Sequence, residues 1–129
     1  MQEENNEEQD ELTERKDQGK PTLSIEEVRK YLLTTQFDFN PTQQRISFPL
    51  IQRYILLLSG GSEAPAIQID ENSIVNGHHR YISGCIYERK PDTVPWLKAT
   101  STSILNWTEV IVVEEDFGAN YDDHRFNKN

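Results

Sequence analysis

The stretch IQIDENSIVNGHHR, residues 67–80, is the most informative part of the sequence, because its pattern predicts two short strands, a turn and the start of a helix. Residues 66–70 alternate apolar and polar side chains, Glu71-Asn72 can turn, and residues 73–75 form a second apolar run. The sequence therefore predicts a β-hairpin. A helix is expected to follow from about residue 78 to residue 89, where a proline-containing stretch ends it.

Two further helices are predicted upstream of the hairpin. Ser24 begins a capping box, and apolar residues then recur at helical spacing, which predicts a helix over residues 25–34. Ser47 can cap a second helix that has proline in its first turn, a broad apolar face and a Gly-Gly end at residues 60–61. Residues 36–45 lack periodicity and are interpreted as a connecting loop.

Downstream, residues 94–97 are typical of an edge strand that tolerates proline, and residues 109–114 of a buried β-branched strand. Helices and short strands are interspersed, which favours a small α/β (α+β) fold with helices packed on a mixed, short-stranded sheet. We expect one domain over residues 21–117, between a leader at 1–20 and a polar tail at 118–129.

The net charge of −9 is concentrated in the leader, where eight acidic residues face three basic ones. Such a segment cannot bury enough apolar surface to order itself, so we expect a disordered acidic leader. The rest of the 129-residue chain offers no basic stripe, which disfavours DNA as a partner. A single cysteine, Cys85, excludes an internal disulfide, and no apolar run approaches membrane-spanning length. These features, with the lack of a signal peptide pattern, predict a cytoplasmic protein without a membrane partner.

The residues at the strand–helix junction, Asn76, Gly77, His78, His79 and Arg80, have the chemistry of an anion site. Glycine lets a ligand approach the backbone, the first helical turn offers N–H groups and a positive dipole end, and arginine supplies a planar fork of donors. Phosphate is the expected ligand of this arrangement. The alternatives are a turn glycine at a strand end and an arginine that pairs with a surface carboxylate.

Two boxes of sequence carry a family resemblance. Residues 40–45, Asn-Pro-Thr-Gln-Gln-Arg, are similar to the Asn-Pro-x-Gln-Pro-Arg motif of the ParB/sulfiredoxin superfamily, with Gln44 in place of its second proline. The stretch Pro65-Ala66-Ile67 resembles the Pro-Ile-x-Val strand of that family, and residues 74–81 resemble its Gly-Glu-Arg-Arg box. The His-His-Arg version is closer to ParB-like proteins outside chromosome partition, including free-serine kinases.

The resemblance implies that the second box opens a helix against the phosphates of a nucleotide: ATP, ADP or CTP, with Mg²⁺ as a common companion. Sulfiredoxins place their reactive cysteine directly before the His-Arg pair, where His78 stands here, so sulfiredoxin activity is not expected. Cys85 lies about two helical turns further along and is interpreted as a core residue. Partition proteins continue into a DNA-binding helix-turn-helix, for which too few residues follow Arg89.

We therefore expect a ParB-like nucleotide-binding domain, and whether it is a phosphotransferase or NTPase stays open. The predicted phosphate-binding residues are those from Asn76 to Arg80, and Arg45 could either reach the nucleotide or stabilise its loop. His78 and His79 are the catalytic candidates, since a histidine pair could act as acid and base in a ParB-like nuclease. No catalytic carboxylate is assigned.

No metal site is expected. Adjacent helical histidines point about 100° apart, and Asp122-Asp123-His124 falls in the polar tail. An alternative from another class is a non-catalytic protein-interaction or regulatory module that keeps the fold and uses the acidic leader or a sheet edge to bind a protein partner.

Overall fold

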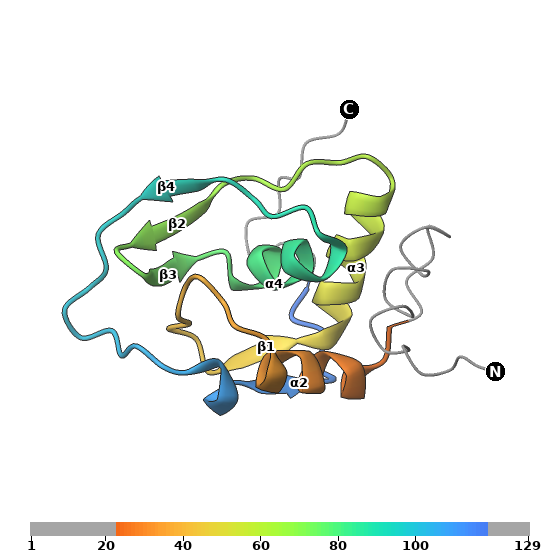
Figure 1. Cartoon of the computed structure of the whole chain (residues 1–129), viewed down its shortest axis with the longest axis horizontal. Helices are drawn as coiled ribbons and strands as arrows, with labels where there is room; N and C mark the ends of the chain where they lie inside the picture. The colour runs from red at the N-terminus through yellow and green to blue at the C-terminus, as the bar shows by residue number, and fades with distance from the viewer. Residues whose placement is uncertain (1–22, 119–129) are drawn as a thin grey trace.

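The computed structural model describes residues 23–118, which form a small α+β domain with two separate sheets (Figure 1). In chain order the elements are α2 (Ile25–Thr34), β1 (Arg45–Ser47), α3 (Phe48–Ser59), β2 (Ile67–Asp70), β3 (Ser73–Asn76), α4 (His78–Tyr87), β4 (Thr93–Pro95), the 3₁₀ turn η2 (Trp107–Glu109) and β5 (Ile111–Val113). Helix α4 lies at the centre, between the three-stranded sheet, α3 and the layer of β1 and α2. The expected leader and almost all of the expected tail lie outside the described residues.

Helix α2 has the bounds that its sequence predicts. The Ser24 hydroxyl accepts a hydrogen bond from the Glu27 amide at 3.1 Å, and the Glu27 carboxylate accepts one from the Ser24 amide at 2.8 Å. This reciprocal pair satisfies amides that an isolated helix end leaves without acceptors. Val28 and Leu32 are the buried residues of the helix, so its narrow apolar stripe attaches α2 to the core.

Helix α3 has Ser47 as its N-cap and Gly60 as its C-cap, which agrees with the predicted ends. Its buried residues recur at helical spacing along one broad face: Leu50, Ile51, Tyr54, Ile55 and Leu58. That face packs mainly on α4, which makes the α3–α4 pair the main helical contact of the domain. Gly61 adopts a φ of 98°, a left-handed conformation that lets the chain leave the helix at low steric cost.

The predicted hairpin is present as β2 and β3, which pair antiparallel, with Ile69 opposite Ile74. Strand β4 pairs parallel with β2 at the edge of the sheet. It begins one residue before the predicted strand and ends at Pro95 rather than at residue 97. Helix α4 ends at Tyr87 instead of residue 89, because Glu88 takes a left-handed conformation and the Arg89 amide turns back to the Gly84 carbonyl.

Strand β1 corrects the expectation that the chain is a loop up to Arg45. Residues 45–47 pair parallel with β5, Arg45 opposite Ile111 and Ser47 opposite Val113. A three-residue strand is too short to show periodicity, and its partner lies far along the chain. Strand β5 is also less buried than predicted, since only Val112 is buried and Ile111 is half exposed.

The core lies between the helices and the two sheets, and it ends in an aromatic group around Trp107. Tyr81 stacks on Trp107 at 6.2 Å between ring centroids, and Phe37 packs against both rings. The Trp107 indole donates to the Phe39 carbonyl at 2.7 Å. Cys85 is buried in the same core, as predicted, and burial is the main cause that raises the pKa of its thiol to about 11.

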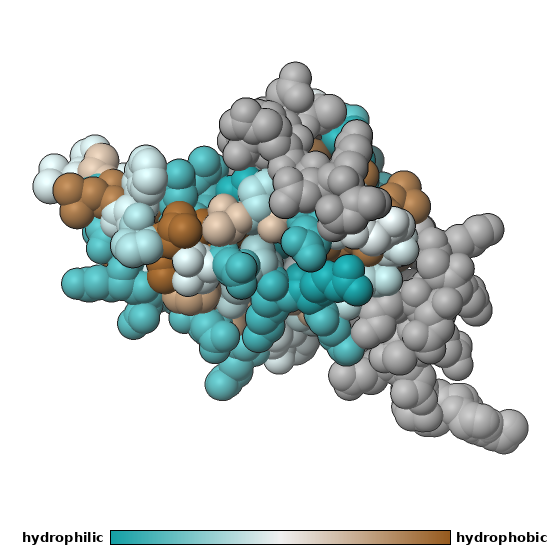
Figure 2. Space-filling view, turned by 90° about the horizontal axis from the view of Figure 1, so that it is seen from above, coloured by the Kyte–Doolittle hydropathy of each residue, from teal (hydrophilic) through white to brown (hydrophobic). Residues whose placement is uncertain are grey.

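On the face seen from above, apolar side chains form small groups separated by polar ones (Figure 2). The most exposed large apolar residues include Trp96 and Leu97, just after β4. Among the described residues, no helix combines the length and the apolar character needed to cross a membrane.

Candidate anion-binding site

The junction between β3 and α4 is built around Gly77. It has a φ of 107°, a left-handed conformation that glycine adopts readily, and it is the N-cap of α4. A Cβ atom at this position would lie 2.6 Å from Arg80 Nη2, 2.6 Å from Ile67 Cγ2 and 2.9 Å from Ile67 Cβ. The space that glycine leaves is therefore filled by the chain itself, whereas the sequence suggested room for a ligand there.

Arg80 is almost fully buried, with 2% of its surface exposed, and its guanidinium folds back towards the start of its own helix. Two positive features meet there, because the N-terminal end of a helix carries a partial positive charge of its own. The guanidinium therefore adds to the positive potential at the start of α4.

His78 connects α4 to the loop of the first sequence box. Its Nε2 atom accepts a hydrogen bond from the Thr42 amide at 2.9 Å, and the ring packs edge-on against Trp107. The Thr42 hydroxyl donates to the Ile74 carbonyl of β3 at 2.7 Å. Because a backbone N–H can only donate, Nε2 of His78 carries no proton in this arrangement.

His79 makes the equivalent contact with the end of β1. Its Nε2 atom accepts from the Ser47 amide at 2.9 Å, and its ring lies edge-on to Phe117 at 5.7 Å between centroids. His78 and His79 are 2% and 0% exposed, respectively. The sequence identified both histidines as phosphate-binding and catalytic candidates; in the structure both are buried and both hold backbone amides.

Ser47 joins this site to the end of the described chain. Its hydroxyl donates to the Glu115 carbonyl at 2.7 Å and accepts from the amides of Leu50 and Phe117, each at 3.3 Å. The sequence identified Ser47 only as a helix cap. Its contacts with residues 115–117 depend on the pairing of β5 with β1, which also brings Phe117 to His79. This long-range pairing cannot be predicted from the local sequence pattern.

The two sequence boxes lie side by side. The Asn40 amide donates to the Asn72 carbonyl at 2.7 Å, and the Ile74 amide donates to the Asn40 carbonyl at 2.9 Å. Together with the bonds of Thr42, these contacts fix residues 40–42 along β3 and the start of α4. Of the predicted site residues, the structure brings Gly77, His78, His79 and Arg80 together here.

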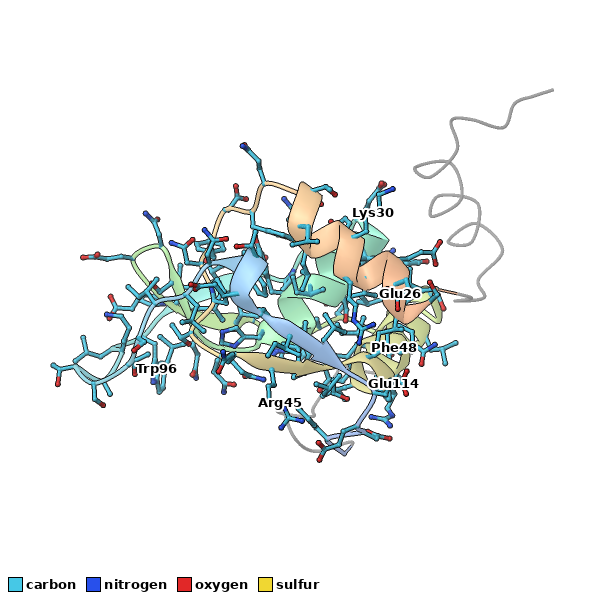
Figure 3. All side chains as sticks on the ribbon, turned by 90° about the horizontal axis from the view of Figure 1, so that it is seen from below. Glu26, Lys30, Arg45, Phe48, Trp96 and Glu114 are labelled. Carbon is cyan, nitrogen blue, oxygen red and sulfur yellow. The ribbon has the colours of Figure 1, made fainter. Side chains whose placement is uncertain are left out.

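Asn76 and Arg45 lie at the margin. Asn76 is exposed at the end of β3, opposite Gln68. Arg45 points away from the body of the domain (Figure 3), forms an ion pair with Glu115 at 3.1 Å, and lies over the Phe117 ring at 5.9 Å. Since both charged side chains are more than half exposed, the pair adds little stability, but it leaves a cation near the outer side of His79.

Other kinds of site find less support in the described part of the chain. Within residues 23–118 no group of three or more histidine, cysteine, aspartate or glutamate side chains could hold a metal ion. Asp122-Asp123-His124 lies outside the described residues. A cleft of about 260 Å³ lies between the end of α2, the 35–40 segment and η2, and its lining contains none of the predicted anion-site residues.

Comparison of the chain with models of protein families, with curated proteins and with solved structures gave no match.

Proposed function

We propose that this chain is a small nucleotide-binding domain of the ParB/sulfiredoxin type, in which the start of α4 and Arg80 receive a phosphate group. The observation that carries the proposal is the direct contact between the two boxes that resemble that family. Thr42 of the first box donates to His78 of the second at 2.9 Å, and Arg80 lies against Gly77 in the same place.

The positive charge at the start of α4 supports phosphate as the ligand. A helix N-terminus offers backbone N–H groups and positive potential, and a guanidinium matches the oxygens of phosphate with two parallel donors. Arg45 at the outer edge can add charge if its exposed ion pair with Glu115 opens. A local positive pocket of this kind suits a small nucleotide such as ATP, ADP or CTP better than a long polyanion, given the acidic chain.

Burial sets a condition on binding. His78, His79 and Arg80 are at most 2% exposed, so a phosphate can reach the amides of α4 only after covering side chains move. The apparent affinity is then the intrinsic affinity reduced by the fraction of molecules that are open. We expect weak binding, in a range that requires millimolar ligand to detect.

Turnover of the nucleotide is a separate question. Phosphoryl transfer needs positioning, charge stabilisation, usually Mg²⁺, and a carboxylate that accepts the proton of the attacking hydroxyl. Asp70, at the end of β2, accepts the Lys98 amide at 2.9 Å, which is a structural role. The nuclease alternative loses support because each histidine Nε2 holds a backbone amide.

Thermal unfolding with ATP, ADP, CTP and GTP, each with and without Mg²⁺, tests the proposal. A ligand at about ten times its Kd stabilises the folded state by about 1.4 kcal/mol, which raises the melting temperature measurably. Arg80→Gln should remove the shift, and Arg89→Gln should keep it, because Arg89 is an exposed residue just beyond α4. If no nucleotide at about 5–10 mM raises the melting temperature of the wild type, the proposal is wrong.

A protein-interaction module on the same fold is the second candidate, and two observations favour it. Residues 77–80 at the junction are buried, and the large apolar residues Trp96 and Leu97 are 54% and 85% exposed. Exposed tryptophan is enriched at interfaces between proteins. A domain that ignores every nucleotide but loses a cellular partner when Trp96 is changed to Ser would fit this function instead.

A further inference from the structure

We infer that His78 and His79 form a proton-sensitive lock that fastens residues 42–47 to the start of α4 while both imidazoles are neutral. The inference concerns a conformational device of the fold, and it holds whether or not a nucleotide binds. It goes beyond the proposed function because it assigns the histidine pair a role in holding and releasing a segment.

The geometry of the two hydrogen bonds carries the inference. Thr42 N–H donates to His78 Nε2 and Ser47 N–H donates to His79 Nε2, both at 2.9 Å. The two donors are five residues apart in one segment, and the two acceptors are adjacent on one helix. A single turn of α4 therefore holds both ends of the segment that contains β1 and most of the first box.

Protonation reverses the polarity of each contact. An imidazolium has N–H at both ring nitrogens, so a protonated Nε2 would face a backbone N–H that also can only donate. Both rings are buried, so neither amide can turn to water without local movement of the chain. Proton uptake at His78 must release Thr42, and proton uptake at His79 must release Ser47.

Several charged groups lie near the two rings. Arg80 is next to His79 on α4, and Arg45 of β1 lies over the Phe117 ring that packs on His79. Glu115 after β5 pairs with Arg45 and is largely exposed. On η2, which packs on His78 through Trp107, the Glu109 carboxylate accepts the Asn106 amide and serves as a cap.

The sign of the pH effect follows. The locked arrangement requires neutral rings, so it is complete at alkaline pH and is lost on acidification as the imidazoles take up protons. If each opening of residues 42–47 is coupled to the uptake of one proton, the protection of the amide against hydrogen exchange falls by up to about tenfold for each unit by which the pH is lowered.

Hydrogen exchange of the whole chain by NMR between pH 7.5 and pH 5 tests the lock, with rates expressed relative to an unstructured chain at the same pH. The protection of the Thr42 and Ser47 amides should fall on acidification, while that of the Leu32 amide in α2 should stay nearly constant. Constant protection at Thr42 and Ser47 would overturn the inference, and so would an equal loss at Leu32, which would indicate general unfolding.

Variants separate the two halves of the lock. Glutamine can present its Oε1 atom as an acceptor and does not titrate, so His78→Gln should remove the acid response at Thr42 only, and His79→Gln that at Ser47 only. His124→Gln, outside the described residues, is the control and should leave both responses intact. If the variants do not fold, imidazole ¹⁵N shifts of the wild type decide: a protonated Nε2 on either ring at pH 7.5 contradicts the lock.

Discussion

The replacement of Gly77 by alanine is the sharpest test of how the start of α4 is packed. Gly77 has a φ of 107°, and the new methyl group would lie 2.6 Å from both Arg80 Nη2 and Ile67 Cγ2. The left-handed backbone costs an alanine roughly 1–2 kcal/mol. Forcing a methyl group into filled space costs roughly 1–3 kcal/mol more.

The guanidinium end can move, but Ile67 Cβ, 2.9 Å away, is held by its strand. We therefore expect Gly77→Ala to lower the free energy of unfolding by about 2–5 kcal/mol, a large part of the 5–15 kcal/mol typical of a domain. Urea unfolding followed by the fluorescence of buried Trp107 measures this loss.

Gly61→Ala is the matched control. Gly61 also has a positive φ, 98°, but nothing lies within 4 Å of the Cβ position, so its variant loses only the backbone part, about 1–2 kcal/mol. The difference between the two variants isolates the packing of Arg80 and Ile67 against the junction. If Gly77→Ala is no more destabilising than Gly61→Ala, the packed arrangement described above is incorrect.

Three further predictions concern single side chains. Ser47→Ala should lower the free energy of unfolding by about 1–3 kcal/mol in urea, because it removes a cap and the bonds to residues 115–117; a loss below 0.5 kcal/mol, on the order of a neutral surface change, would refute that role. Trp107→Phe should cost about 1–3 kcal/mol by leaving the Phe39 carbonyl without its donor, and a neutral result would contradict the 2.7 Å bond. Burial raises the pKa of Cys85 to about 11, so the fold favours the thiol, and the resulting stability is present below about pH 8.5 and lost as pH rises through 11. Native protein should therefore react slowly with a thiol reagent at pH 8 and rapidly in urea; equal rates would disprove this.

Local sequence signals predicted most of the helices and the hairpin. The capping box at Ser24 and the Gly-Gly stretch at residues 60–61 mark helix ends by chemistry that acts within one turn, so α2 and the end of α3 agree with expectation. The alternation before Asn76 gave the hairpin for the same reason. The C-terminal end of α4 was misplaced by two residues, since Glu88 takes a left-handed conformation usually reserved for glycine.

Long-range features were less accessible to the sequence. The parallel pairing of β1 with β5 joins residues 45–47 to residues 111–113, and nothing in either three-residue segment specifies its partner. The sequence marked Gly77 to Arg80 as chemically unusual and grouped them correctly at one helix start. It could not reveal that the imidazoles hold Thr42 and Ser47, because these contacts depend on how the first box folds across β3.

Titration of ¹⁵N-labelled protein with ADP and with adenosine is the decisive test of phosphate binding, because the two ligands differ only in the phosphates. We expect ADP to move the amide signals of Gly77, His78, His79 and Arg80, and adenosine at the same concentration to leave them unchanged. Unchanged junction signals at millimolar ADP, or equal movement with adenosine, would contradict phosphate binding at the start of α4.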